Sequence, residues 1–442
     1  MATIILGGGI IGLATAFYLS ELEPELAADH KIHIVDSASE LLLSASGYAG
    51  GFLAKDWFSH PSASLGELSF RLHKELAAKY GGSKEWSYAP SMVYSLAANS
   101  RGMSKPTGGA DWLLEGTSRT DEAPASTNGA RSEEMLNEDG SPAWFSKQKD
   151  GTLEELDVSG GCAQIEPKQF CRFLLEKCEE RGVQVHTNCT ASGVFKNADG
   201  KIGGVKVRKD TEIYEKHASR IVVAAGAWTP QVFSKLFPGS RLKIPITPLA
   251  GYSIVARSPR LSKPIIDPKR HPEGKSEPIA HAVYCGPTSG WGFSPEVFSR
   301  IPADGRPELW AGGVNDPELK LPETADAAAA LKVREKAEEL RSAMIAMTGL
   351  SKEGDNLNDN DLDIVREGLC FRPVSRSGVP IISKVREEVL GPDIKFEKDG
   401  GVYVASGHGP WGISLSAGTG KVMAEMLLGR KLSADISRLS MR

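Results

Sequence analysis

A glycine-rich hexamer near the start of the chain is the clearest candidate for chemistry. Residues 7–12 read GGGIIG and fit the spacing G-x-G-x-x-G, between an apolar run and a stretch with helical character. In such a turn Gly7 permits a tight bend, Gly9 lets the backbone approach a pyrophosphate at the positive helix N-terminus, and Gly12 allows close packing of helix on strand. The spacing therefore predicts a dinucleotide-binding turn.

A carboxylate supports this interpretation. Asp36 ends the next apolar run, 24 residues after Gly12, where an acid is expected to accept hydrogen bonds from ribose hydroxyls. The alternative is a merely tight turn between a strand and a helix, which the glycine spacing alone does not exclude. The strand, the helix and the acid together favour the dinucleotide. They do not distinguish NAD from FAD.

Three later segments are rich in small residues that could line a flavin. Residues 44–53 read SASGYAGGFL, residues 221–228 read IVVAAGAW, and residues 404–414 read VASGHGPWGIS. In the last segment, backbone N–H groups and the dipole of the following helix could stabilise the negative charge of a reduced flavin. An ordinary strand–turn–helix connection is the alternative. However, several glycines in one turn leave the backbone uncovered by side chains, which favours a site where a ligand approaches the backbone.

The elements that must position these motifs follow from the apolar periodicity. Predicted strands at 3–6 and 31–35 flank a predicted helix at 13–22, which makes a βαβ unit at the N-terminus. Further helices are expected at 170–178, 326–347 and 421–428, and further strands at 183–185, 202–207 and 402–405. Residues 99–150 are rich in Gly, Ser, Pro and acidic residues, with Trp112 and Trp144 among their few apolar anchors. This composition predicts an irregular insertion.

The charge balance excludes some classes of partner. Lys and Arg number 52 and Asp and Glu 56, a net charge of −4, so no overall basic field exists to hold nucleic acid or an anionic membrane. The six cysteines form no CxxC pair and no Cys/His cluster, so neither a metal site nor a disulfide framework is expected. Small molecules are the expected partners, in a reducing compartment.

No signal peptide or transmembrane segment is predicted. The apolar run at 4–19 contains turn-forming glycines, lacks a preceding Lys or Arg, and falls short of the ~20 residues that a spanning helix needs. We therefore expect a cytoplasmic protein. The C-terminal residues LSMR match the peroxisomal signal poorly, although a serine and a basic end leave a peroxisomal location open.

The chain resembles the D-amino-acid oxidase, glycine oxidase and sarcosine oxidase superfamily. The resemblance is carried by the three segments rich in small residues, together with residues 368–374 (GLCFRPV) and 378–382 (GVPII). The resemblance covers most of the chain except residues 99–150. Residues 160–167 and 294–298 are similar to a fungal branch of that superfamily whose substrate is uncharacterised, with one yeast member linked to endosomal traffic. The resemblance implies FAD and hydride transfer from an amine or amino acid to flavin N5. The imine product is then hydrolysed, and oxygen is usually reduced to hydrogen peroxide.

The resemblance also assigns roles around Arg372. Relatives that use amino acids carry an arginine here that binds the substrate carboxylate, and a structural ion pair beneath the flavin is the alternative. Cys370 lies where sarcosine oxidases attach flavin through a thioether, but the residues that follow depart from that pattern. We therefore predict non-covalent FAD, with Cys370 a small buried side chain. His408 and Trp411 are expected near the substrate, with core packing the favoured role of Trp411.

The catalytic candidates are Arg372 and His408. The residues expected to bind the cofactor are Gly7, Gly9, Ile10, Ile11, Gly12, Asp36, Ser37, Ser44, Ser46, Gly50, Gly51, Phe52, Leu53, Ala191, Ala225, Gly226, Trp228, Cys370, Arg372, Gly407, Gly409, Pro410, Trp411, Gly412, Ile413 and Ser414.

The expected fold is α/β, with a Rossmann-type FAD-binding domain and an interleaved α+β substrate domain built on a mixed or antiparallel sheet. We expect the FAD-binding domain at 1–65, 155–235 and 365–442, and the substrate domain at 66–154 and 236–364. Three functions stay open: an amine or amino-acid oxidase, a flavin dehydrogenase that uses a protein or quinone acceptor, and a flavoprotein that acts mainly as a partner in a trafficking complex. The oligomeric state is not predicted.

Overall fold

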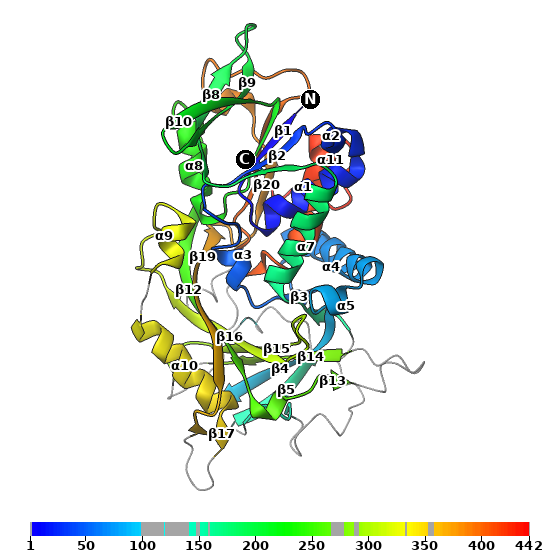
Figure 1. Cartoon of the computed structure of the whole chain (residues 1–442), viewed down its shortest axis with the longest axis vertical. Helices are drawn as coiled ribbons and strands as arrows, with labels where there is room; N and C mark the ends of the chain where they lie inside the picture. The colour runs from blue at the N-terminus through cyan, green and yellow to red at the C-terminus, as the bar shows by residue number, and fades with distance from the viewer. Residues whose placement is uncertain are drawn as a thin grey trace.

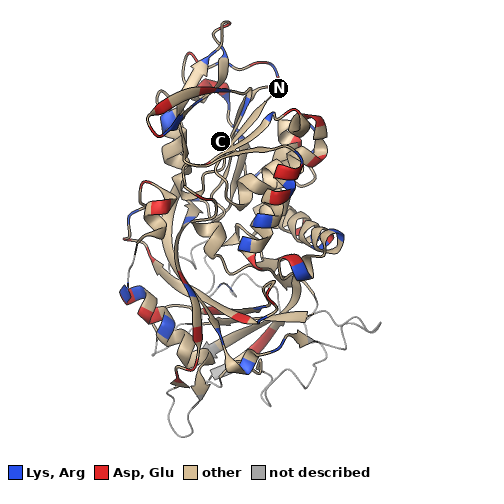
Figure 2. Cartoon of the chain, viewed as in Figure 1, with Lys and Arg blue, Asp and Glu red and all other residues tan. Residues whose placement is uncertain are grey.

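The computed structural model describes residues 2–98, 119, 141–146, 151–157, 160–266, 278–286, 291–331, 334–351 and 358–441. The molecule is elongated, with a smaller sheet toward one end and a larger sheet toward the other (Figure 1). Acidic and basic residues are interspersed along the ribbon of the described chain (Figure 2). No helix in the described ranges is both long enough and apolar enough to cross a membrane.

The smaller sheet has, in the described chain, six strands in the order β20-β21-β11-β1-β2-β7. All neighbours pair in parallel except β20 and β21. The central strand is buried at every residue, as expected for a parallel sheet covered on both faces. The strands are β1 (Thr3–Leu6), β2 (Ile32–Val35), β7 (Gln184–His186), β11 (Arg220–Val223), β20 (Ile381–Lys384) and β21 (Gly401–Ser406). This is the predicted Rossmann-type arrangement.

Helix α1 (Ile10–Leu22) begins directly after the glycine turn, and its residues from Ile10 to Ser20 are all buried. Two glycines allow this close packing. A Cβ on Gly12 would collide with the carbonyl oxygen of Gly7, and a Cβ on Gly420 in α11 (Ser416–Leu427) would collide with the backbone of Ala14. Helix α1 is therefore held tightly between the sheet and α11.

The larger sheet follows the order β19-β12-β16-β15-β14-β4-β6-β3 in the described chain, with β13 beside β14 and β5 beside β4. It is mixed, because β14 and β4 pair in parallel whereas their neighbours are antiparallel. The longest pairing joins β12 to β19, from Ile246 opposite Ser375 to Arg257 opposite Asp363. The strands are β3 (Phe52–Ala54), β4 (Ala89–Ala98), β5 (Gly151–Asp157), β6 (Cys162–Gln164), β12 (Ile246–Arg257), β13 (Ile265–Ile266), β14 (Pro278–Cys285), β15 (Glu296–Arg300), β16 (Glu308–Asp316) and β19 (Asp363–Ser375).

The remaining elements flank these sheets. The other strands are β8 (Cys189–Lys196), β9 (Ile202–Lys209), β10 (Glu212–His217), β17 (Leu350–Ser351) and β18 (Asn358–Asp359). The other α-helices are α2 (Pro24–Ala28), α3 (Ala45–Tyr48), α4 (His60–Tyr80), α5 (Gly82–Glu85), α7 (Pro167–Glu180), α8 (Thr229–Leu236), α9 (Ala325–Ala329) and α10 (Arg334–Thr348). Short 3₁₀ turns are η3 (Gly226–Trp228), η4 (Pro259–Leu261), η5 (Glu387–Val389) and η6 (Gly409–Trp411).

The prediction of one helix over 326–347 was wrong. Helix α9 ends at Ala329, and α10 begins only at Arg334. The two helices have different partners: Asp326 in α9 accepts a hydrogen bond from the backbone N–H of Ser39, whereas α10 packs Leu340 and Met344 into the core beside the larger sheet. Tertiary contacts therefore override a helical composition that is continuous in the sequence.

The expected division into domains stays a prediction. Strands β3 and β6 fall within the stretches assigned to the FAD-binding domain, yet both belong to the larger sheet. Most of the expected insertion at 99–150, Trp112 included, lies outside the described residues. Within it, Trp144 and Phe145 are buried in the core of the larger sheet, as apolar anchors would be.

Candidate active site

A cavity of about 560 Å³ lies between the two sheets. It is bordered by residues at the carboxyl ends of β1, β2, β11 and β21, and by residues of β12 and β19. Ligands of open parallel sheets bind outside the carboxyl ends of the strands, and this volume falls within the ~300–1,000 Å³ of typical cofactor and ligand sites. One end thus faces the Rossmann-type sheet and the other faces the larger sheet.

The glycine turn borders the first end, which we call the dinucleotide end. Gly7 has a φ of +112°, and a Cβ there would collide with the carbonyl oxygen of Ala224. By contrast, a Cβ on Gly9 would meet only the Ser46 hydroxyl, at 3.2 Å. The protein therefore leaves space beside Gly9, where a pyrophosphate is expected to approach the start of α1. The Ile10 N–H already donates to Ser46 Oγ at 3.0 Å.

Asp36 lies at the same end and holds the turn. Its carboxylate accepts hydrogen bonds from the N–H groups of Gly8, at 2.7 Å, and Ala38, at 2.9 Å. Two carboxylate oxygens offer about four acceptor positions, so this carboxylate can also receive ribose hydroxyls. Arg208 and Lys235 border this part of the cavity together with Ala191. Their positive charges suit the phosphates of a dinucleotide.

A segment from the larger sheet crosses the dinucleotide end. Residues 321–325, which we call the strap, lead from β16 into α9 and border the cavity. Trp228 Nε1 donates to the carbonyl oxygen of Pro322 at 2.8 Å. Next to the strap, the Asp326 carboxylate accepts from the N–H and hydroxyl of Ser39. The strap is therefore attached on both sides of the dinucleotide end.

The second end, which we call the substrate end, is formed by one face of the larger sheet. Paired residues of neighbouring strands point to the same side, so Gly368, Ser253 and Gly312 share one face in a single row. Gly251 and Cys370 lie on the same face two residues along.

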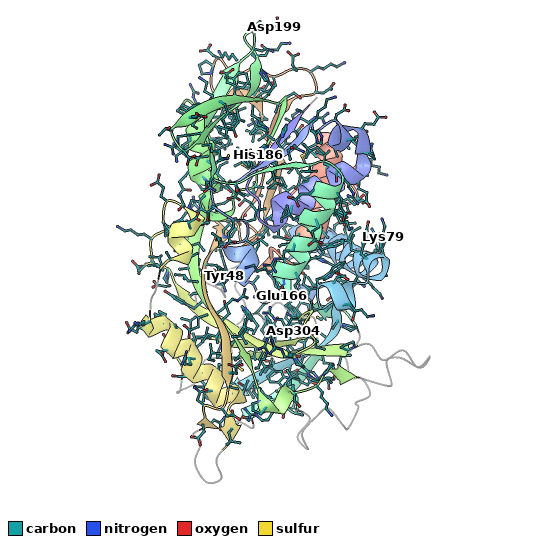
Figure 3. The ribbon with its side chains drawn as sticks, in the orientation of Figure 1. Tyr48, Lys79, Glu166, His186, Asp199 and Asp304 are labelled. Carbon is teal, nitrogen blue, oxygen red and sulfur yellow. The ribbon has the colours of Figure 1, made fainter. Side chains whose placement is uncertain are left out.

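Long side chains lie flat across the glycines of this face. A Cβ on Gly251 would collide with Arg372, one on Gly312 with Trp310, and one on Gly368 with Tyr48. Tyr48 lies near the middle of the molecule, between the two sheets (Figure 3). The glycines thus let these three long side chains lie against the backbone of the sheet, because each side chain occupies the space that a Cβ would fill.

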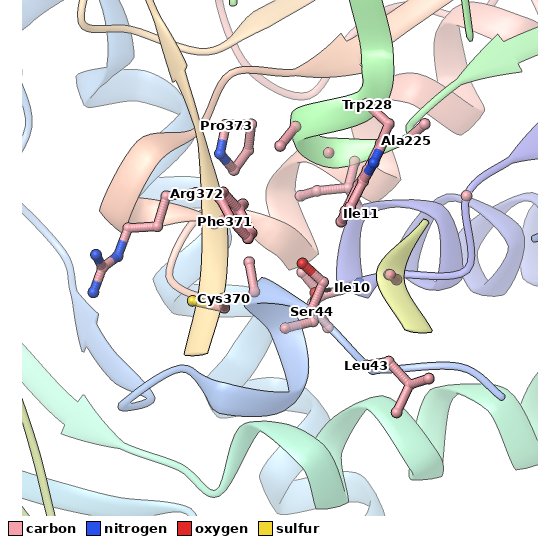
Figure 4. Close-up of a pocket in the computed structure, with 18 of the residues that line it drawn as sticks. Ile10, Ile11, Leu43, Ser44, Ala225, Trp228, Cys370, Phe371, Arg372 and Pro373 are labelled. Atoms are coloured by element: carbon pink, nitrogen blue, oxygen red, sulfur yellow. Dashed lines mark hydrogen bonds between the residues drawn. The ribbon is translucent and has the colours of Figure 1, made fainter. Parts of the chain in front are cut away.

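Arg372 extends from β19 away from Ile11 and Trp228, which lie at the dinucleotide end (Figure 4). Its Nη1 donates to Asn315 Oδ1 at 2.6 Å. Arg372 borders the cavity, whereas Asn315 does not belong to the described lining. The guanidinium is thus held by a neutral side chain outside the lining. This hydrogen bond does not balance its positive charge at the substrate end.

His408 is buried, with 4% of its surface exposed, and borders the cavity. Its Nε2 lies 3.1 Å from Thr419 Oγ1, and within the described chain Nδ1 has no hydrogen-bond partner. Burial lowers the pKa of His408 to about 3. The imidazole is therefore neutral at physiological pH, and its Nδ1 is itself buried.

Aromatic side chains wall the substrate end. Phe298 stacks on Trp310 with ring centroids 5.1 Å apart and on Phe52 at 5.8 Å. Phe52 also meets Tyr284 edge-on at 5.5 Å. A Cβ on Gly50 would clash with the Phe298 and Trp310 rings. These rings make a rigid apolar wall that excludes water beside the charged groups.

Most of the predicted site residues border one continuous cavity. They are Gly7, Gly9, Ile10, Ile11, Asp36, Ser37, Ser44, Ser46, Gly50, Gly51, Phe52, Ala191, Ala225, Gly226, Trp228, Cys370, Arg372, His408, Gly409, Pro410, Gly412 and Ile413. Their roles toward a cofactor stay predictions.

Five of the predicted site residues, all within the described ranges, do not belong to the cavity lining. Gly12 has the packing role given above, and Leu53 is fully buried in the core. Gly407 has a φ of +80° in the turn after β21. The Trp411 ring packs on Phe58, with centroids 4.9 Å apart, and Ser414 Oγ accepts from the Ala54 N–H at 3.0 Å. Packing, the favoured role of Trp411, matches its position.

Sequence reasoning missed several residues of the lining. Among them are Tyr48, Ser253, Phe298, Trp310, Arg208, Lys235 and the strap. An isolated glycine within a strand, such as Gly251, indicates that another group lies close to the backbone there. The sequence does not show whether that group is a ligand or a side chain. Arg119 was missed because it lies in the expected insertion. It borders the cavity with 8% of its surface exposed.

The arrangement suits FAD. The space at Gly9, the acceptors of Asp36 and the cations at the dinucleotide end fit a dinucleotide whose ring system reaches toward the larger sheet. No three His, Cys, Asp or Glu side chains in the described ranges are grouped so as to hold a metal ion. Fold and site therefore define a flavoprotein oxidoreductase.

Comparison with known proteins identifies the family. Residues 2–426 match the DAO family model, described as FAD dependent oxidoreductase, so this chain belongs to that family and is an FAD-dependent enzyme. An oxidoreductase of Schizosaccharomyces pombe is 25% identical over 454 residues, covering 99% of this chain and 96% of its own. A D-amino acid dehydrogenase of Neisseria meningitidis is 23% identical over 505 residues, covering 100% of this chain and 99% of its own.

A solved structure shows the same fold. Glycine oxidase from Geobacillus kaustophilus superposes with a TM-score of 0.64 at 17% identity, covering 100% of this chain and 98% of that one. The predicted membership of this superfamily and the predicted FAD-binding fold are confirmed.

Proposed function

We propose that this enzyme oxidises the C–N bond of an amine or amino acid to an imine, which water then hydrolyses. The observation that carries the proposal is the position of Arg372, whose guanidinium borders the substrate end and is fixed there by Asn315. A planar, permanently charged fork suits a carboxylate. When bound, FAD supplies the hydride acceptor, flavin N5.

The residues of this chain act by placement and by exclusion of water. Arg372 would hold the substrate by its carboxylate, and the rings of Phe298 and Trp310 would keep water away from the reacting carbon. His408 would border the site as a neutral group rather than act as a base, because burial lowers its pKa to about 3.

Oxygen is the proposed electron acceptor, with hydrogen peroxide as product. The fold shared with a glycine oxidase supports this choice. A second candidate is a dehydrogenase that passes electrons to a protein or quinone, and full-length similarity to a D-amino acid dehydrogenase favours it. The proposed location is cytoplasmic, which fits six cysteines that are all buried and, in the described structure, form no disulfide.

The test is an anaerobic screen of the yellow holoenzyme with amines, amino acids and N-substituted amino acids. A substrate will bleach the flavin absorbance near ~450 nm, as hydride transfer requires. Admitting air should then restore the colour and release peroxide. Bleaching that air does not reverse would favour the dehydrogenase. A panel in which no member bleaches the flavin would refute the proposed function.

A further inference from the structure

Ser253 presents a hydroxyl without a protein partner to the substrate end. The residue borders the cavity and is 5% exposed, and its side chain makes no hydrogen bond with any described residue. The hydroxyl of Tyr252, next to it on β12, is also without a partner but is sealed from solvent, whereas the Ser253 hydroxyl is not sealed. A molecule in the cavity can therefore reach this oxygen. A polar group at such a depth is expected to bond to a ligand or to water.

Glycines flank Ser253 on both neighbouring strands. Ser253 pairs with Gly312 of β16 on one side and with Gly368 of β19 on the other. Neither neighbour has a side chain that could bond to the hydroxyl. The next residue of this row, Glu296, lies two strands away and forms an ion pair with Arg119 at 3.1 Å. The row therefore leaves the hydroxyl available to a ligand.

Two aromatic side chains stand beside the hydroxyl. Tyr48 occupies the space that a Cβ on Gly368 would fill, and Ser253 Oγ lies 2.9 Å from the same position. Trp310 occupies the corresponding space over Gly312. Both rings border the cavity together with Ser253. We call the part of the cavity that Ser253, Tyr48 and Trp310 border the serine slot.

Contacts on several sides fix the two walls of the serine slot. Trp310 Nε1 donates to the backbone carbonyl oxygen of Tyr48 at 3.0 Å, and the Trp310 ring stacks on Phe298. The Cζ of Arg366 lies 5.3 Å from the centroid of the Tyr48 ring, and its Nη1 donates to the carbonyl oxygen of Gly47 at 2.9 Å. A hydrogen bond missing between such apolar walls is costly, because water is largely excluded.

The hydroxyl is within reach of a molecule held by Arg372. The guanidinium lies over Gly251, which is on the same face of β12 as Ser253 and two residues before it. Two residues of a strand span roughly 7 Å. An amino acid whose carboxylate binds Arg372 can therefore reach the serine slot with a side chain of only a few atoms.

We infer that the substrate carries an uncharged hydrogen-bonding side chain, a hydroxyl or a carboxamide, that bonds to Ser253 in the serine slot. The inference rests on the proposed function and narrows it to polar, uncharged amino acids. A hydroxyl can donate and accept hydrogen bonds but cannot balance a charge. A methyl group in its place would displace water and leave Ser253 unpaired, so the site rejects apolar analogues. Ser253 is a specificity-determining residue with no part in the redox step.

The experiment measures binding without turnover. β-Hydroxypropionate, γ-hydroxybutyrate and δ-hydroxyvalerate are titrated into the holoenzyme, and the flavin absorbance reports the dissociation constants. Each is compared with the carboxylate in which a methyl group replaces the hydroxyl, namely butyrate, valerate and caproate. At least one hydroxy acid should bind about 10-fold more tightly than its methyl counterpart. Equal binding in all three pairs, or no binding of any hydroxy acid, would overturn the inference.

Variants assign the preference to Ser253. Ser253→Ala removes the hydroxyl and keeps the Cβ, so the ratio of the two dissociation constants should fall to near one. Ser342→Ala, which removes an exposed serine hydroxyl of α10, is the matched control and should leave the ratio unchanged. Ser253→Cys keeps a weak donor and should retain only part of the preference. A full ratio in either folded Ser253 variant contradicts the role of this hydroxyl, so the test stays open if one of them does not fold.

These ligands have no C–N bond, so the result is independent of the bleaching screen. A preference for hydroxy acids in an enzyme that no amine reduces would refute the proposed oxidation and keep the serine slot. Bleaching by amines, without any preference among the paired ligands, would keep the oxidation and refute the role of Ser253.

Discussion

Arg372 lies over Gly251 of the neighbouring strand, in the space that a Cβ on that glycine would fill. The two residues are on paired strands, and the guanidinium crosses β12 to reach Asn315 on β16. The cation therefore depends on a glycine for its position and on an amide for its orientation. Neither dependence involves the dinucleotide end, so substrate binding and cofactor binding should respond to different substitutions.

Arg372→Lys should damage the use of carboxylated substrates. Lysine keeps the charge but loses the fork, so kcat/KM for amino acids should fall ~10–1000-fold, or about 1.4–4 kcal/mol, with FAD content and Tm nearly unchanged. Gly251→Ala should have the same effect, because its methyl group displaces the guanidinium. Steady-state kinetics with amino acids and with uncharged amines provide the check. Equal losses for both kinds of substrate would remove Arg372 from the carboxylate site.

Gly9→Val should abolish FAD binding while the apoprotein folds. The φ of Gly9 is −75°, which valine can adopt, and only the Ser46 hydroxyl lies near its Cβ; the new side chain instead fills the space beside α1. Gly12→Ala is the matched control, since its methyl group collides with Gly7 and should lower the Tm with or without FAD. Flavin absorbance and apoprotein melting separate the two. A yellow Gly9→Val protein would contradict the placement of the pyrophosphate.

Acid precipitation should release the flavin into the supernatant. Cys370 is buried, with 6% of its surface exposed, and burial raises the pKa of its thiol, although Arg372 and Arg366 oppose this shift. A protonated thiol is a poor nucleophile toward a flavin ring. Spectra of the pellet and the supernatant are compared for the wild type and Cys370→Ser. A yellow pellet that becomes colourless in the variant would show a covalent bond.

The stability of the holoenzyme should fall between pH 7 and pH 5, partly because of His408. In the unfolded chain the pKa of histidine is about 6.5, whereas in the folded protein that of His408 is about 3. Only the unfolded state therefore takes up this proton at pH 5, which costs about 2 kcal/mol of stability. His408→Asn should reduce the loss by that amount in urea unfolding at the two pH values. Equal losses in both proteins would mean that His408 is not buried in a neutral state.

Asp326→Ala should accelerate FAD release. The substitution frees the strap from Ser39, whereas Trp228 still holds Pro322. We expect a ~10-fold faster loss of flavin on dilution, consistent with the roughly 1.5–3 kcal/mol of hydrogen bonds to a charged group. Asp304→Ala, which removes another exposed acidic side chain, is the control. Equal release rates for both variants would show that the strap does not limit release.

The sequence predicts the dinucleotide end well because its signals are local. The turn at 7–12 adjoins its own strand and helix, and Asp36 follows within the same βαβ unit. The substrate end is different. Its floor arises where residues 246–257 pair with 363–375, and no local pattern specifies that Arg372 crosses Gly251. Likewise, the place of Arg119 beside Trp411 joins two segments nearly 300 residues apart in the chain, a contact that periodicity cannot reveal.

The order of strands in the smaller sheet has a consequence for biosynthesis. Its central strand, β1, is made first, yet it needs β11 on one side, and β21 must follow before Gly409 and the residues after it can complete the cavity. At ~5–20 residues per second, a nascent chain spends on the order of tens of seconds with the apolar β1 in search of partners. Flavin can therefore be captured only late in translation or afterwards, and until then the cofactor cannot protect the apolar strand from non-native contacts.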